Sequence, residues 1–458
     1  MKKRIISIML IAFMLFNASL MPVSAEESKI THSTVKSAIQ YALDVATLSE
    51  KYLNNMLLAQ FDYMDYSHIL PTLYLTGDMS EISKENSVIL AYRFEKTDGS
   101  VYVVNGNCEL KWQGASSLSY PKKNFNIKFD NKFEAKEGWG KQKKYCLKAN
   151  FIDCTHARNV GSARLWGQIV NTRDETDPIT KKLQSLPNGG AVDGFPVMLV
   201  INGEFYGLYT FNIQKDKWMF DMEDTKQKNQ AILCADAWSE SNFFKAPATL
   251  NGDFDIEHNS YEEVSDNPEW IRQSLNNLIN SCIESDGSDL DSKIGKYLDW
   301  NSAIDYYIFT TLIGAFDCFG KNYMLSTYDS EKWFFSAYDL DTTFGLNWNG
   351  ESFVEPTRTD SGTIFKYAER HRVMELILKH KTDEFIKRYW ELREGVLSES
   401  NVSLTLVETV GDIPQEVYEA DYRLWNTIPN TKENTLERID AWYSERAEFM
   451  DEQIKSLE

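Results

Sequence analysis

Two acidic segments in the second half of the chain have the residue types and spacing of a phosphoryl-transfer site. The first reads DCFGKN at 317–322, and the second reads YDLDTTFG at 338–345. In protein kinases one Asp orients the substrate hydroxyl, while an Asn five residues later and an Asp beyond a hairpin hold magnesium ions. Magnesium suits such a place because it takes a few carboxylate or amide oxygens plus water. The residues at this spacing are Asp317, Asn322, Asp339 and Asp341.

A purely structural role for these acids is the alternative. Asp-x-Asp pairs occur often in surface turns, and an Asp at a helix end is commonly a cap. Both segments adjoin strongly apolar runs at 306–316 and 333–335, where an unpaired carboxylate is costly. This setting favours the catalytic interpretation.

A small-residue turn and a lysine-bearing strand lie earlier in the chain, reading WQGASS at 112–117 and YPKKNFNIK at 120–128. Small residues let backbone N–H groups approach an anion, and a lysine on the next strand can reach phosphate oxygens. Strand alternation places Asn126 and Lys128 on one face. The alternative is that the lysines after Pro121 belong to a solvated turn. The candidate anion-binding residues are Gly114, Ser116, Ser117, Lys123 and Lys128.

A third polar segment, NFID at 150–153, precedes a predicted helix that carries Arg158. One interpretation is that Asp153 or Thr155 caps the helix and that Arg158 lies at the surface. The other is that Arg158 organises the site or contacts phosphate. The predicted cleft would then be basic, formed by Lys123, Lys128 and Arg158 on an otherwise acidic protein.

The elements that must position these residues change in type along the chain. Short strands are predicted between 69 and 149, and Asn202-Gly203 is a strong hairpin signal. An irregular insertion or hinge is predicted at 215–264. Helical periodicity then dominates from Pro268, interrupted by a strand-turn-strand within 322–345. Strands first and helices later favour an α+β fold with segregated lobes.

Composition restricts the class of protein. The 458 residues include 68 acidic and 48 basic side chains, for a net charge of −20. This charge argues against nucleic-acid binding and against docking on anionic lipid. With 43% hydrophobic and 13% aromatic residues, the chain is not a disordered acidic protein. The six cysteines are widely scattered and lack zinc-site spacing, so we expect most of them to be buried thiols.

The first 25 residues have the pattern of a secretory signal peptide. Basic residues precede an apolar stretch that ends in VSA at 23–25, as an A-x-A-like cleavage site requires. No later stretch reaches the roughly 18 apolar residues of a membrane span. We therefore expect an exported protein, secreted or associated with the cell envelope, with no integral membrane span.

The order of these motifs resembles the spore-coat protein H (CotH) kinase family of atypical, secreted protein kinases. The family's Gly-x-Ser-Ser turn with Pro-Lys-Lys corresponds to 114–128, and its Leu-x-Ala-Asn-x-x-Asp with an Arg-Asn helix to 147–159. Its Asn-Gly-Glu hairpin corresponds to 202–209, and its Asp-to-Asn and Asp-x-Asp-x-x-Phe-Gly elements to 317–345. The resemblance extends over roughly residues 69 to 455.

This resemblance implies an atypical protein-kinase-like bilobal fold. A helical segment at 26–67 would precede a core at 68–355, with a strand-rich N-terminal lobe at about 68–214 and a helix-rich C-terminal lobe at about 265–355. A helical extension at 356–458 would follow.

The resemblance also implies how the residues act. Asp317 would be the catalytic Asp, and Lys123 or Lys128 would contact ATP phosphates. Asn322 with Asp339, Asp341 or both would hold Mg²⁺ or Mn²⁺. The substrate would be Ser or Thr of an exported, coat or envelope protein.

Two departures from the family pattern are visible. Many members have Glu soon after the hairpin, where this chain reads NIQK at 212–215, and many have Pro-Trp where it has Ala337-Tyr338. Two alternatives remain: a non-catalytic surface or coat module that binds protein or carbohydrate through aromatic grooves, and a glycosyltransferase that uses Asp339 and Asp341 with Mn²⁺. The latter would more naturally have a parallel α/β sheet, which the element order does not suggest.

Overall fold

The computed structural model describes residues 61–186, 188–261, 268–358 and 368–458, together with several helical positions between 39 and 58. The predicted signal peptide at 1–25 and most of the segment at 26–67 lie outside the described residues. Strands occupy the first part of the described chain and helices most of the later part, which confirms the predicted α+β class. None of the helices in the described ranges is long and apolar enough to cross a membrane.

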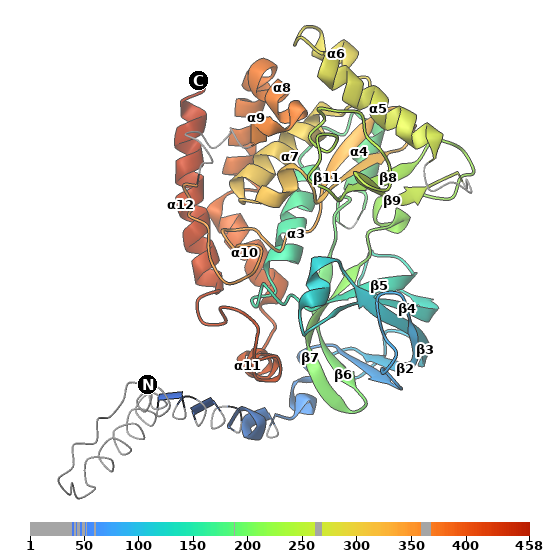
Figure 1. Cartoon of the computed structure of the whole chain (residues 1–458), viewed down its shortest axis with the longest axis vertical. Coiled ribbons are helices and arrows are strands. Elements are labelled where there is room, and N and C mark those ends of the chain that lie inside the picture. Colours follow the sequence, from blue (N-terminus) through green and yellow to red (C-terminus); the bar gives the residue numbers. More distant parts are fainter. Residues whose placement is uncertain are drawn as a thin grey trace, which may run out of the picture.

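Seven strands of the first part form a closed barrel (Figure 1). Its order is β1-β2-β3-β4-β5-β7-β6, and a parallel pairing of β1 with β6 closes it. The other pairings are antiparallel. The strands are β1 (Thr72–Thr76), β2 (Val88–Glu95), β3 (Gly106–Gln113), β4 (Asn124–Phe133), β5 (Gln142–Lys148), β6 (Gly194–Ile201) and β7 (Glu204–Ile213).

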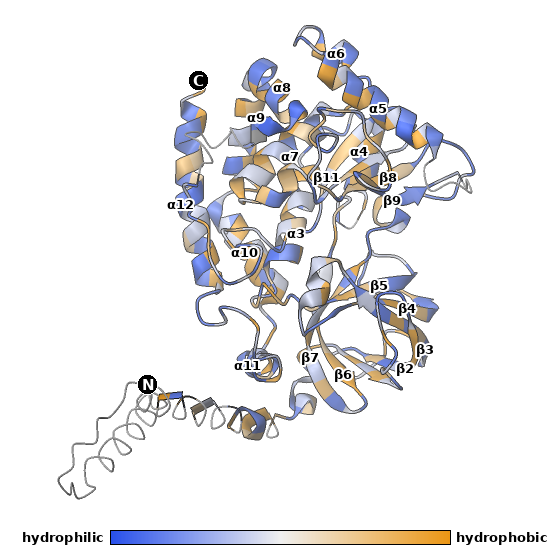
Figure 2. Cartoon of the chain, viewed as in Figure 1, coloured by the Kyte–Doolittle hydropathy of each residue, from blue (hydrophilic) through white to orange (hydrophobic). Residues whose placement is uncertain are grey.

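The barrel interior follows from strand alternation. In β4, Phe125, Ile127 and Phe129 are buried while the residues between them are more exposed, as a period of two requires. Strand β6 is hydrophobic along most of its length (Figure 2). The predicted hairpin joins β6 to β7, with Asn202 at φ 53° and Gly203 at φ 84°. Asn and Gly are the residues that accept this left-handed backbone most readily, which confirms the turn.

A second sheet has the order β11-β10-β8-β9 and is antiparallel. Its strands are β8 (Ala231–Ala235), β9 (Phe254–Asn259), β10 (Tyr323–Thr327) and β11 (Trp333–Ala337). The prediction of an irregular segment at 215–264 is therefore wrong. Strand β8 is a five-residue run buried throughout, so it lacks the alternation that identifies a half-buried strand. Its partner β10 follows about ninety residues later, beyond the reach of local patterns.

Helices form most of the later part of the chain. The α-helices are α3 (Arg158–Val170), α4 (Pro178–Gln184), α5 (Glu269–Glu284), α6 (Leu290–Lys293), α7 (Trp300–Leu312), α8 (Arg372–His380), α9 (Thr382–Glu394), α10 (Glu399–Val410), α11 (Gln415–Leu424) and α12 (Leu436–Lys455). Short 3₁₀ turns are η1 (Tyr63–Tyr66), η2 (Ser116–Ser119), η3 (Lys217–Phe220), η4 (Phe316–Phe319) and η5 (Ala368–Arg370).

Helix α7 is the centre of the helical part. Every residue of α7 except Asn301 is buried, and the helix contacts β11, α3, α8, α9 and α12. Its one buried acid, Asp305, is held by Arg173 and Arg388 at 2.7 Å each. Because α7 is fixed on all sides, it provides a rigid support for the segment that follows it, which carries Asp317.

Candidate active site

A cavity of about 730 Å³ lies between the barrel and the second sheet. Residues from the β3–β4 turn, the end of β5, the 150–152 loop and the end of β7 line its barrel side. Residues after β8, on β9, at 317–322 and at 338–342 line the opposite side. The cavity therefore gathers segments that are more than two hundred residues apart in the sequence.

Asp317 lies in η4, directly beyond α7. The hydroxyl of Tyr306 on α7 donates to the carbonyl oxygen of Cys318 at 2.6 Å, which fixes η4 against the helix. The Asp317 side chain is about one third exposed, and the ammonium of Lys321 lies 3.8 Å from its carboxylate. Asp317 thus presents an accessible carboxylate on a rigid support, as a residue that orients a substrate hydroxyl requires.

Asn322 and Asp339 both have left-handed backbone, each with φ 56°. The amide N–H of Asn322 donates to Ala235 on β8 at 2.9 Å. The Asn322 side-chain amide makes no hydrogen bond within the part of the chain that the structure describes. Uncommon backbone conformations of this kind concentrate at functional sites because the surrounding structure must enforce them.

Hydrogen bonds to α3 and to the end of α7 hold the loop that carries Asp339 and Asp341. The amide N–H of Leu340 donates to Asn159 on α3 at 3.3 Å, and the Thr343 hydroxyl donates back to the Leu340 carbonyl at 3.0 Å. The Phe344 N–H donates to Ile313 at the end of α7 at 2.7 Å. The predicted acidic pair is therefore positioned by both α3 and α7.

The electrostatics of Asp341 fit a divalent cation. Burial, followed by the neighbouring charge of Asp339, raises the pKa of Asp341 to about 8, although Lys148 opposes this shift. A cation bound between the two carboxylates would offset both effects. The donor set of two carboxylates and the Asn322 amide consists of hard oxygen ligands, which suits Mg²⁺ or Mn²⁺ completed by water and phosphate. Within the described ranges, no group of three or more His, Cys, Asp or Glu side chains is placed to hold a metal, so this site would depend on such additional ligands.

The predicted small-residue turn also lines the cavity, through Gly114, Ser116 and Ser117. Gly114 has φ 126°, and a Cβ at this position would lie 2.1 Å from the Ser117 hydroxyl, so only glycine fits. Asn124 fastens the turn: its side chain donates to the Ser117 hydroxyl at 3.4 Å and accepts from the Ala149 N–H at 2.7 Å.

The three predicted cationic residues do not line the cavity, so the prediction that they form its basic lining is wrong. They are Lys123, Lys128 and Arg158. Lys123 donates to the carbonyl of Leu118 at 2.7 Å and lies 5.2 Å from the centre of the Trp112 ring, so it stabilises the turn from behind. Lys128 pairs with Glu109 at 3.0 Å on the exposed outside of the barrel. Asn126 lies on the same face of β4 as Lys128, but it does line the cavity. Strand β4 leads away from the cavity between these two residues, so Lys128 lies outside it.

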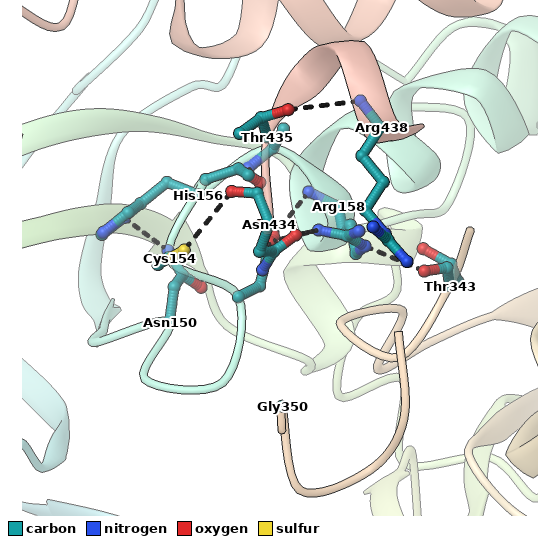
Figure 3. Close-up of polar contacts among 12 residues, drawn as sticks. Asn150, Cys154, His156, Arg158, Thr343, Gly350, Asn434, Thr435 and Arg438 are labelled. Carbon is teal, nitrogen blue, oxygen red and sulfur yellow. Dashed lines mark hydrogen bonds and ion pairs between the residues drawn. The ribbon is translucent and has the colours of Figure 1, made fainter. Parts of the chain in front are cut away.

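Arg158 is fully buried, and Figure 3 shows it between Asn434 and Thr343. Its guanidinium donates to Asp153 at 2.6 Å, to Asn434 at 2.7 Å and to the Thr343 carbonyl at 2.9 Å. Asp153 also accepts from the Arg158 backbone N–H at 2.9 Å, near the start of α3. Arg158 therefore organises the loop behind Asp341 and is neither a surface residue nor exposed to a phosphate in the cavity.

Other charged residues at the cavity were not singled out from the sequence. Lys148 ends β5 and lies near enough to Asp341 to influence its pKa. Lys215 follows β7; it pairs with Glu257 on β9 at 2.5 Å and lies 5.0 Å from the centre of the Tyr338 ring. Lys148 is the variable residue of the Leu-x-Ala-Asn segment. Its position at the end of a predicted strand was the sequence signal that could have identified it as a site residue.

The prediction of a basic cleft is therefore wrong, because both cationic and acidic side chains line the cavity. Its lining cations are Lys84, Lys122, Lys148, Lys215 and Lys321, and its lining acids are Asp236, Asp255, Glu257, Asp317, Asp339 and Asp341. A polyanionic ligand would need divalent cations in such a cavity, because lysines alone do not outnumber the carboxylates.

The extent of the match to known families decides the classification. Residues 90–450 match the family model described as CotH kinase protein. The chain belongs to the CotH kinase family. The matched range contains the turn at 114–117 and both acidic segments, so the CotH match covers every predicted site residue. No curated protein matches the chain. The six cysteines are all buried and free, as expected from their scatter.

Proposed function

We propose that this CotH kinase family member is an exported phosphotransferase that uses ATP with Mg²⁺ or Mn²⁺ to phosphorylate Ser or Thr of another protein. The observation that carries the proposal is the single cavity that brings together Asp317, Asn322, Asp339, Asp341 and the Gly114–Ser117 turn. These are the parts that phosphoryl transfer requires, because its catalysis consists of positioning and electrostatic stabilisation.

Each part has a role in the proposed reaction. The carboxylate of Asp317 accepts a hydrogen bond from the acceptor hydroxyl and takes its proton as the oxygen bonds to the γ-phosphorus of ATP. The bond from this phosphorus to the β-phosphate oxygen breaks, and ADP leaves. Asn322, Asp339 and Asp341 would hold a divalent cation, which would supply positive charge to offset the negative charge of the phosphate oxygens. The turn at Gly114 covers the phosphates, and Lys148 replaces Lys123 and Lys128 as the proposed phosphate contact.

The kinase-like bilobal arrangement is part of the same proposal. The barrel, with its turn, would be the N-terminal lobe. The second sheet and the helices would be the C-terminal lobe, and residues 213–216 would connect the two lobes beside the cavity. The glycosyltransferase alternative has less support, because the second sheet, which precedes the acidic pair, is antiparallel and not a parallel doubly wound sheet.

The proposed acceptor is an exported protein of the spore coat or cell envelope. The support is the signal-peptide pattern of residues 1–25 and the family membership. A non-catalytic module that binds protein or carbohydrate is the competing function, and the binding of ATP separates the two.

The decisive experiment follows the transfer of labelled γ-phosphate from ATP to co-exported proteins. Asp317→Ala is expected to lower the rate by at least about a hundredfold, while thermal unfolding shows that the fold is retained. Asp412→Asn, which changes an exposed acid outside the cavity, is the matched control. Transfer by Asp317→Ala at the wild-type rate would refute the assigned role, and a wild-type protein that binds no ATP would favour the non-catalytic module.

A further inference from the structure

Lys321 is a cationic residue of the cavity that has no role in the reaction described above. It immediately precedes Asn322 in the chain, and its ammonium lies 3.8 Å from the carboxylate of Asp317. All three residues line the cavity. A positive charge therefore adjoins both the proposed catalytic carboxylate and a proposed ligand of the divalent cation.

The backbone of Lys321 is anchored on both sides. Its N–H donates to the carbonyl of Asp317 at 3.1 Å, and the N–H of Asn322 donates to Ala235 on β8 at 2.9 Å. The first of these bonds closes one turn of chain, and residues four apart in a helical turn lie on the same side. The two bonds therefore direct the side chain of Lys321 toward Asp317.

Close packing restrains the same turn. A Cβ at Gly320, the residue before Lys321, would lie 2.5 Å from the ring of Phe243 and 2.6 Å from the ring of Trp238. The turn is thus pressed against the segment that follows β8. The Lys321 side chain itself is 31% exposed, so its ammonium can adjust to a ligand while its backbone stays fixed.

The Lys321 ammonium retains hydrogen-bonding capacity. An ammonium has three donors, and its 3.8 Å contact is longer than the roughly 2.7–3.2 Å of a hydrogen bond. Within the described ranges of the chain, this ammonium makes no hydrogen bond. Two other lysines of the cavity are already committed, because Lys122 is paired with Asp421 and Lys215 with Glu257. Lys321 is therefore available to an anionic ligand.

The proposed reaction fixes which anion Lys321 would meet. The acceptor oxygen would lie at Asp317, and the divalent cation at Asn322 and the acidic pair. The γ-phosphoryl group must lie between these two places, because its phosphorus bonds to the acceptor oxygen and its oxygens approach the cation. A lysine aimed at a transferring phosphoryl group stabilises the negative charge that its oxygens carry.

Lys321 and Lys148 approach this place from opposite walls. Lys148 ends β5 on the barrel side of the cavity, where its charge influences the pKa of Asp341. Lys321 belongs to the wall formed by the 317–322 segment, next to β8. The two lysines can therefore bind different phosphates of one nucleotide.

We propose that Lys321 is a further catalytic residue, whose ammonium binds the γ-phosphate oxygens of ATP and stabilises their charge during transfer. This inference rests on the proposed function for the identity of the nucleotide. Lys321 forms no covalent bond and exchanges no proton in the step, so the proton of the acceptor hydroxyl still passes to Asp317. A purely structural role has little support, since an exposed ion pair of this kind contributes only about 0–1 kcal/mol to stability.

The binding test uses the full exported chain with MnCl₂ and compares ADP with an ATP analogue that has a non-hydrolysable β,γ-imido link. Wild type is expected to bind the analogue more tightly than ADP. Lys321→Met should weaken binding of the analogue about tenfold or more, on the scale of one lost charge-assisted hydrogen bond, and should leave the Kd of ADP nearly unchanged. Lys321→Arg should retain most of the preference for the analogue.

A matched control is available on α9. The ammonium of Lys387 also lies 3.8 Å from a carboxylate four residues later, that of Glu391, but neither residue lines the cavity. Lys387→Met should therefore leave both Kd values unchanged. Thermal unfolding should show that Lys321→Met and Lys387→Met are both about as stable as wild type, because each loses only an exposed pair.

Transfer kinetics separate this assignment from the proposed function. Lys321→Met is expected to lower kcat about tenfold or more. If wild type transfers phosphate and Lys321→Met keeps both its kcat and its preference for the analogue, the assignment is wrong and the proposed function stands. If that preference depends on Lys321 but no protein is phosphorylated, the proposed function fails while the γ-phosphate contact stands.

Two other results would also overturn the assignment. A lower kcat with an altered pH profile, but with the preference for the analogue intact, would make Lys321 a partner of Asp317 and not a ligand of phosphate. A wild-type protein that binds neither nucleotide would refute the assignment and the proposed function together.

Discussion

The ammonium of Lys122 lies 2.8 Å from a carboxylate oxygen of Asp421, and both side chains are fully buried. Lys122 leads into β4 close to the Gly114 turn, whereas Asp421 belongs to α11, near the end of the chain. Lys122 also donates to the Leu208 carbonyl at 2.6 Å, and Asp421 accepts from the Leu208 N–H at 2.9 Å. Helix α11 is therefore fastened to β7 and to the turn that covers the cavity (Figure 1).

Breaking this pair should destabilise the protein strongly. Asp421→Ala leaves the Lys122 ammonium buried without its counter-charge and is expected to cost about 3–5 kcal/mol of unfolding free energy. Urea unfolding measures the loss. In Lys122→Met with Asp421→Leu, both charges are removed and part of the stability should return. A single Asp421→Ala variant as stable as wild type would contradict a buried, paired arrangement.

Asp341 should link pH, stability and metal binding. Its pKa of about 8 in the folded protein lies above the unfolded value of 3.8, so the folded state binds more protons between these two pH values. Without metal, this group makes the protein less stable as pH rises from about 4 to about 8. Asp341→Asn is therefore expected to raise the stability of the metal-free protein at pH 8, by a few kcal/mol as an order of magnitude.

Metal should reverse this trend in wild type only. Mn²⁺ binds the deprotonated carboxylate, so its stabilising effect should grow as pH rises toward 8. Thermal unfolding from pH 5 to pH 9, with and without MnCl₂ and ATP, measures both effects. An Asp341→Asn variant that gains as much from Mn²⁺ as wild type would exclude Asp341 as a ligand.

Lys148 and Lys128 should behave differently in ATP binding. Lys148→Met removes the cation near the acidic pair and is expected to raise the KM for ATP about tenfold or more, on the scale of one lost charge-assisted hydrogen bond. Lys128→Met disrupts only an exposed pair with Glu109, which contributes little to stability. Equal effects of the two substitutions on ATP binding would contradict the placement of Lys148 at the phosphates.

Gly114 should be required for the turn over the cavity. Gly114→Ala places a Cβ against the Ser117 hydroxyl at a φ of 126°, so the turn must move. We expect ATP-induced stabilisation to fall sharply. The matched control is Gly99→Ala, at φ 78° with nothing within 4 Å of the added Cβ. Both substitutions introduce backbone strain of about 1–3 kcal/mol, so a loss of ATP binding in Gly114→Ala alone isolates the contact.

The parts of this protein that have a local signal could be predicted from the sequence. The Asn202-Gly203 hairpin, helix α3 and the strands around 125–129 are specified by turn chemistry and periodicity within a few residues. Asp317, Asn322, Asp339 and Asp341 could be selected together because their spacing reflects one short connection, a strand-turn-strand. The small-residue turn could be selected for the same reason, since a close backbone approach needs Gly114 itself.

Which cations lie near these residues depends on the packing of the whole fold. Lys128 and Asn126 share one face of β4, yet two residues separate them by roughly 6–7 Å, enough for one to line the cavity and the other to lie outside it. The sequence left open whether Arg158 lies at the surface or contacts a phosphate. Its contacts with Asn434 and Thr343, which come from distant segments, show that it is buried behind the site. Strand β8 and the Lys215–Glu257 pair depend on contacts between segments far apart in the chain. Side-chain direction and long-range pairing are properties of the packed fold, and no local pattern of residues encodes them.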